Sequence, residues 1–99
     1  MITVHAYVWA RPEHADAYRA GLTALQESTL AHDPGCLAYA CWESLTEPGA
    51  FVCVEEWTDR AALDAHLAAP HHTAGSAALD AYRARPADVR VFESRPIDL

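Results

Sequence analysis

The first segment of the chain constrains the fold most, because both faces of the strand it predicts are apolar or aromatic. Residues 2–10 alternate between two sets of side chains. One set contains Ile2, Val4, Ala6 and Val8, and the other contains Thr3, His5, Tyr7 and Trp9. A period of two residues is typical of a β-strand. A sheet with two such faces needs a cover on each side, so we expect helices on one side and a second copy of the chain on the other.

A long amphipathic helix is predicted over residues 12–31. Pro12 suits the first helical position, and four inward positions recur at spacings of 4, 3 and 4 residues. These positions are Tyr18, Leu22, Leu25 and Thr29. The sequence Asp33-Pro34-Gly35 ends the pattern, because proline and glycine do not continue a helix.

Two shorter helices are predicted later in the chain. The first covers residues 59–69, with Thr58 or Asp59 as N-cap and Pro70 as the stop. Its inward face is predicted to carry Leu63, His66 and Leu67. The second covers residues 71–84, and its inward stripe is predicted to contain Ala74, Ala78, Ala81 and Tyr82.

The remaining strands complete an α+β pattern. Residues 36–45 and 50–58 are rich in β-forming side chains and flank Glu47-Pro48-Gly49-Ala50, whose Pro-Gly pair predicts a type II turn and therefore a hairpin. A last strand is predicted over residues 87–95. The order β-α-β-β-α-β, with one extra short helix, is the ferredoxin-like arrangement. We expect one domain over residues 1–99, and a homodimer that packs sheet against sheet.

Charge and cysteine content argue against several classes of partner. Seven arginines, no lysine and 14 acidic side chains give a net charge of −7, which disfavours nucleic acid and anionic membranes. No apolar run approaches the roughly 20 residues of a membrane span, and the first residues carry no signal-peptide core. Cys36, Cys41 and Cys53 are odd in number and lie inside apolar segments, so we expect three unpaired thiols and a reducing, cytoplasmic location. Cys41 and Cys53 fall on the two strands of the predicted hairpin, so these two residues could lie close together.

Several motifs resemble one known family. They are Arg11-Pro12-Glu13, Asp33-Pro34-Gly35-Cys36, and Glu55-Glu56-Trp57 followed by His66 and Pro70-His71. Together they resemble antibiotic biosynthesis monooxygenase domains over essentially the whole chain. The resemblance implies a dimeric α+β barrel with a pocket between sheet and helices in each protomer. Members of that family include cofactor-free oxygenases of aromatic polyketides, quinol oxygenases and haem-degrading enzymes.

Differences from the residue patterns of these three groups of enzymes indicate which group this chain resembles most. The polyketide oxygenases carry an asparagine and a tyrosine where this chain has Cys53 and Leu63. The haem degraders differ at all three of their positions, which align with Ala6, His66 and Ser76. The quinol-oxygenase pattern fits best, because it resembles this chain at Glu55, Trp57, His66 and His71.

The candidate catalytic residues are His66, Glu55 and Trp57. His66 is placed inward and is a candidate base near neutral pH. Glu55 and Trp57 share strand parity, and Glu55 could approach His66 and raise its pKa. A structural Glu55–His66 pair and a catalytic one are both open at this point.

The candidate substrate-binding residues are His71 at the pocket mouth and Tyr39, Cys53 and Leu63 in its wall. We interpret Cys53 as a small apolar residue and not as a nucleophile. No metal site is predicted, because spacings of five and one among His66, His71 and His72 put no two of them on one helix face.

The sequence hypothesis is a cofactor-free monooxygenase that combines dioxygen with a hydroquinone, phenol or polyketide. Two alternatives stay open: a non-oxidative binding protein, isomerase or cyclase that uses the same His66, and a haem-binding protein.

Overall fold

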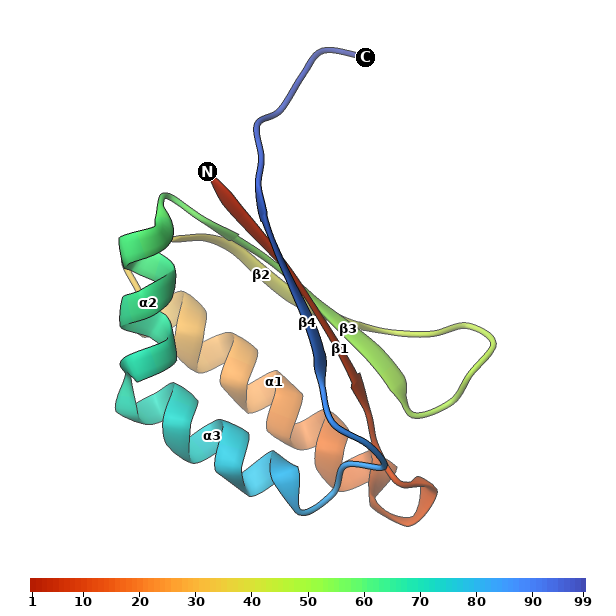
Figure 1. Ribbon diagram of the computed structural model, residues 1–99. Helices are drawn as coiled ribbons and strands as arrows, with labels where there is room; N and C mark the ends of the chain where they lie inside the picture. The colour runs from red at the N-terminus through yellow and green to blue at the C-terminus, as the bar shows by residue number, and fades with distance from the viewer.

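The computed structural model describes all 99 residues as one four-stranded antiparallel sheet with three helices on one side (Figure 1). The strands are β1 (Ile2–Trp9), β2 (Cys36–Glu43), β3 (Ala50–Trp57) and β4 (Asp88–Glu93). The helices are α1 (Ala15–His32), α2 (Arg60–Ala68) and α3 (Pro70–Asp80). The sheet order β2-β3-β1-β4 confirms the predicted ferredoxin-like α+β fold. None of the helices combines the length and the apolar character that crossing a bilayer requires.

Local signals placed the helices well. Pro12 begins a 3-10 turn, Pro12–His14, that leads into α1, and all four predicted inward residues of α1 are buried. Asp59 caps α2 by accepting a hydrogen bond from the backbone N–H of Ala62 at 2.8 Å, as predicted.

The third helix differs from the prediction in its bounds and in its buried side chain. Pro70 ends α2 and at the same time begins α3, where its missing N–H costs no helical hydrogen bond. The residue buried from α3 is Leu79, not the predicted alanine stripe. Leu79 packs onto Gly21, so that α1 and α3 approach closely.

Paired residues of β1 and β3 point to the same side of the sheet, and the register pairs Val4 with Glu55 and Val8 with Phe51. Phe51, Cys53, Glu55 and Trp57 all lie on the helix side and are buried. The single register shift lies in β2, between Cys36 and Ala38, and leaves β3 regular. Gly49, with φ of +84°, occupies the position of the predicted type II turn that needs glycine, and Ala50 N–H donates to the Glu47 carbonyl at 3.1 Å.

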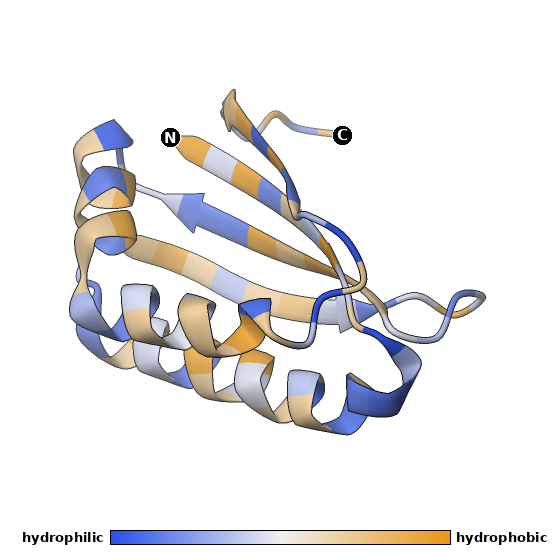
Figure 2. Cartoon of the chain, turned by 60° about the horizontal axis from the view of Figure 1, so that its bottom comes forward, coloured by the Kyte–Doolittle hydropathy of each residue, from blue (hydrophilic) through white to orange (hydrophobic).

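The opposite side of the sheet, called the open face here, carries large apolar side chains that no helix covers. It consists of His5, Tyr7 and Trp9 of β1, Trp42 of β2 and Phe92 of β4. Trp42 is 63% exposed and Phe92 is 44% exposed. The Arg85 guanidinium lies 3.6 Å from the centre of the Trp9 ring. Figure 2 shows strongly hydrophobic residues alternating with less hydrophobic ones along β1, as expected for a strand whose two faces carry different side chains.

The expectation of three unpaired thiols is wrong. Cys41 and Cys53 form a disulfide between β2 and β3, and only Cys36 is free. The two residues lie directly opposite each other in the register that the hairpin turn sets, with Cα atoms 4.0 Å apart. Counting cysteines could not reveal this register. The inference of a reducing compartment therefore loses the support that it took from unpaired cysteines.

Thiol counting tests the pairing. Under denaturing conditions without reductant, the chain should release one titratable thiol, that of Cys36, and after reduction it should release three. The variant Cys36→Ser should show none before reduction. Three thiols in the unreduced chain would contradict the pairing.

Candidate functional site

A cavity of about 230 Å³ lies between the sheet and the helices. Its wall is mostly apolar, with Val4 and Val8 from β1 and Leu22 and Leu25 from α1 among its residues. The polar side chains in the wall are Tyr39, Glu55, His66, His72, Ser76 and Arg83. An apolar cavity with a few converging polar groups is the usual form of a small-molecule site.

Five of the seven sequence-selected residues line this cavity: Tyr39, Cys53, Glu55, Leu63 and His66. Trp57 and His71 do not line it. Trp57 is fully buried, and its ring lies behind His66 with centroids 4.5 Å apart. Leu67, predicted to be buried, lines the cavity but is 49% exposed.

His66 is held by Asp33 and not by Glu55, which corrects the expectation from sequence. His66 comes from the last turn of α2 and is 2% exposed, and its Nδ1 lies 2.7 Å from Oδ2 of Asp33. A carboxylate only accepts hydrogen bonds, so Nδ1 carries the proton and donates it. Nε2 then keeps its lone pair, and it has no hydrogen-bond partner within the protein.

The protonation state of His66 follows from its surroundings. Burial lowers the pKa of His66, and the hydrogen bond with Asp33 raises it by less. The net pKa lies below the ordinary histidine value, so the imidazole is neutral at neutral pH. A neutral ring with a free Nε2 can accept a proton from a ligand in the cavity.

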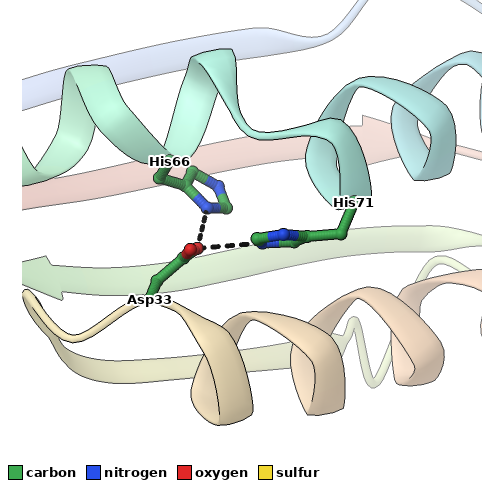
Figure 3. A group of neighbouring side chains, drawn as sticks. All are labelled: Asp33, His66 and His71. Atoms are coloured by element: carbon green, nitrogen blue, oxygen red, sulfur yellow. Dashed lines mark hydrogen bonds and ion pairs between the residues drawn. The ribbon is translucent and has the colours of Figure 1, made fainter.

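His71 binds the same oxygen of Asp33 from the other side. It stands in the first turn of α3, and its Nε2 lies 3.0 Å from Oδ2 of Asp33 (Figure 3). Burial alone would raise the pKa of Asp33, but the hydrogen bonds from His66 and His71 outweigh burial and hold it below its usual value. The three ligand-type atoms of this Asp33–His66–His71 cluster lie within 4.8 Å of one another.

Glu55 is a second titratable group in the cavity wall. It is 5% exposed, and its carboxylate accepts a hydrogen bond from Nε1 of Trp57 at 3.1 Å. Burial raises the pKa of Glu55 to about 7, and the hydrogen bond from Trp57 lowers it only in part. A carboxyl group with this pKa can both give and take a proton near neutral pH. No hydrogen bond joins Glu55 to His66.

Sequence reasoning missed Asp33, His72 and Arg83. Nδ1 of His72 is buried without a hydrogen-bond partner, and its ring lies 4.5 Å from that of His66. Arg83 donates to Asp80 and to the Tyr18 hydroxyl while it lines the cavity. The only local signal at Asp33 was the sequence Asp33-Pro34-Gly35, which predicts the end of a helix. It does not indicate that the Asp33 side chain contacts His66 and His71, which are 33 and 38 positions further along the chain.

The substitution Glu55→Gln should stabilise the protein at alkaline pH. The folded pKa of about 7 exceeds the ordinary 4.5, so the folded state binds more protons between these values and the wild type loses stability as pH rises through 7. Glutamine stays neutral and keeps an oxygen for Trp57. From pH 5 to pH 9 the free energy of unfolding should shift in favour of the variant by about 3 kcal/mol. Denaturant unfolding at both pH values measures this shift.

The control for that experiment is Glu56→Gln, the adjacent residue on the other face of β3. It should show no comparable pH-dependent gain. An equal gain from both substitutions would mean that the effect reflects net charge and not the burial of Glu55.

The comparisons with known proteins agree with this fold. A model of the family "Antibiotic biosynthesis monooxygenase" matches residues 1–78. A crystal structure of an antibiotic biosynthesis monooxygenase is 35% identical, with TM-score 0.89 over 97% of this chain and 100% of that one. A candidate monooxygenase of the same name from Deinococcus radiodurans is 30% identical, with TM-score 0.92 over 100% of this chain and 98% of that one.

A curated relative is an uncharacterized protein from Synechocystis sp. (strain ATCC 27184 / PCC 6803 / Kazusa). It is 33% identical over 61 residues, which are 62% of this chain. This chain spans only 42% of the length of that relative. The family match, which covers most of the chain, and the agreement of the whole fold lead to one conclusion: the chain belongs to the antibiotic biosynthesis monooxygenase family.

Proposed function

We propose that the chain is a cofactor-independent monooxygenase that acts on a small, electron-rich aromatic in the cavity between sheet and helices. The observation that carries the proposal is the free Nε2 of His66 in a mostly apolar cavity whose wall also contains the buried carboxyl of Glu55. Membership of a family named for monooxygenases supports the reaction class. The cavity wall supports an aromatic ligand, because apolar side chains form most of it.

The size of the cavity limits the substrate. A dry apolar cavity of about 150 Å³ accommodates benzene. The present cavity of about 230 Å³ therefore suits a substituted single ring or two fused rings. Hydroquinones and phenols of this size fit, whereas a polyketide with several fused rings would extend out of the opening.

The residues have distinct roles in the proposed reaction. Nε2 of His66 accepts a phenolic proton, and Asp33 keeps the ring oriented through Nδ1. The phenolate then reduces dioxygen directly. One oxygen atom enters the ring and the other leaves as water, so that hydroquinone and O₂ give a hydroxyquinone and H₂O. All four electrons come from the substrate, and protonated Glu55 supplies a proton to the departing oxygen.

Trp57 serves as a positioning residue in this scheme. Its ring packs against His66, and its Nε1–H donates to Glu55. It therefore fixes both acid–base groups without touching the ligand. Tyr39 and Leu63 form part of the wall, and Cys53 contributes a disulfide sulfur and no thiol.

A non-oxidative reaction is the second candidate, and one observation favours it. Cys53 and Leu63 replace the hydrogen-bonding residues of the polyketide oxygenases, so the wall lacks those two donors. The pair His66 and Glu55 could equally move protons in an isomerisation or a cyclisation. Turnover that persists without oxygen would favour this candidate. Haem fits poorly, because the cavity is smaller than the roughly 300–1,000 Å³ typical of sites for drug-sized ligands.

Oxygen uptake with a panel of one- and two-ring hydroquinones tests the proposed reaction. The metal-stripped protein should consume oxygen above the autoxidation rate, and ¹⁸O₂ should place one labelled atom in the product. His66→Ala should lower the rate by roughly 10²–10⁴-fold, the range for loss of a general base. His14→Ala, which removes a histidine outside the cavity, should not. No uptake above autoxidation with any of these substrates would refute the proposal.

The same proposal includes a homodimer that packs open face against open face. The exposed aromatic side chains of that face, among them Trp42 and Phe92, are the reason for expecting a cover. A stable interface buries about 1,600 Å² in total, which is about 800 Å² on each partner.

Sedimentation tests the dimer. The wild type should sediment at twice 10.8 kDa at micromolar concentration, because covering the open face removes apolar surface from water. Trp42→Glu should shift the equilibrium toward monomer, and Leu45→Glu, in the exposed hairpin loop, should leave it unchanged. A wild-type monomer under these conditions would contradict the expected packing.

A further inference from the structure

We propose that the Asp33–His66–His71 cluster is a binding site for one first-row divalent metal ion, of the zinc and cobalt type. The cluster joins one carboxylate and two imidazoles, each from a different element: the residue after α1, the last turn of α2 and the first turn of α3. Mixed nitrogen and oxygen donors suit Zn²⁺ and Co²⁺, whereas Mg²⁺ and Ca²⁺ prefer oxygen ligands.

The distances within the cluster are close to those of a metal site. Oδ2 of Asp33 lies 2.7 Å from Nδ1 of His66 and 3.0 Å from Nε2 of His71. Two ligand atoms of a tetrahedral zinc ion, each about 2.0–2.1 Å from it, lie about 3.3–3.4 Å apart, so Oδ2 would have to separate from each nitrogen by less than about 1 Å. The two imidazole nitrogens both point toward the same Asp33 oxygen (Figure 3), and the three atoms lie within 4.8 Å of one another. Small shifts of these side chains would therefore let all three atoms bind one ion.

Charge and access also favour a cation at this place. The cluster carries one formal negative charge from Asp33 when both imidazoles are neutral, and the whole chain carries −7. The side chains of Asp33 and His71 are 12% and 21% exposed, whereas that of His66 is 1% exposed. Asp33 and His71 can thus be reached from solvent, whereas His66 lies on the inner side of the cluster.

The ion would lie behind His66 and outside the cavity. Neither Asp33 nor His71 lines the cavity, so the ion cannot contact a ligand there directly. It would act on His66 instead. An imidazole that binds a metal through Nδ1 carries its proton on Nε2, so metal binding converts Nε2 from an acceptor into a donor. No net proton is released from His66, because its proton moves from Nδ1 to Nε2 of the same ring.

This tautomer change makes the ion an inhibitor, a consequence that rests on the proposed function. With the metal bound, Nε2 of His66 cannot accept a phenolic proton. The cluster would then couple divalent metal concentration to the activity of the cavity, through the one residue that belongs to both.

The experiment uses the whole chain, stripped of metal with a chelator and titrated with ZnCl₂ in a calorimeter and with CoCl₂ in a spectrophotometer. One ion per chain should bind, with cobalt absorption typical of nitrogen and oxygen ligands, and MgCl₂ should not compete. His71→Gln should weaken zinc binding by at least the roughly 10–100-fold that loss of a supporting partner costs. Asp33→Asn, which keeps the shape and an acceptor oxygen but loses the charge, should weaken it too.

His14→Gln is the matched control and should bind zinc like the wild type. Absence of stoichiometric binding, or binding that His71→Gln and Asp33→Asn leave unchanged, would overturn the metal site. Oxygen uptake measured beside the titration separates the two proposals. Loss of activity in proportion to zinc bound supports both. Zinc binding without loss of activity leaves the metal site standing and removes His66 as the base.

Discussion

The carboxylate of Asp33 connects the ends of three helices, and the geometry of the cavity depends on that contact. One oxygen accepts hydrogen bonds from His66 at the end of α2 and from His71 at the start of α3. A partly buried carboxylate needs such partners, and two imidazole N–H groups supply them. The same contact decides which nitrogen of His66 carries the proton. Fold and proposed chemistry therefore depend on one interaction.

The cavity keeps polar groups that the fold alone does not require. Glu55 is buried with no cation beside it, and its raised pKa reflects that cost. Nδ1 of His72 is buried with no hydrogen-bond partner. Both groups face a space that an apolar core would have filled, and strained or unsatisfied groups gather at binding sites. Their position in the same wall as His66 is the physical reason to locate the function in this cavity.

Much of the fold could be predicted because its signals are local. Alternation in β1, the Pro-Gly turn of the hairpin and the Asp59 cap each depend on a few consecutive residues. The predicted hairpin put Cys41 and Cys53 on paired strands, but the disulfide was not predicted because it also needs the register that sets them directly opposite each other. The hydrogen-bond partner of His66 could not be predicted from the sequence either. Asp33 is 33 residues away, and nothing between the two positions indicates that they meet. Glu55 was predicted as the partner of His66, but the Glu55 carboxylate accepts a hydrogen bond from Trp57 instead.

The proton position on His66 tests the central claim most directly. Histidine ¹⁵N NMR of the metal-free protein, with His66 assigned by substitution, separates protonated from bare ring nitrogens near neutral pH. The account predicts a neutral ring with its proton on Nδ1 and a bare Nε2, because Asp33 accepts from Nδ1. A proton on Nε2, or on both nitrogens, would contradict the account, since His66 could then not accept a proton from a ligand in the cavity.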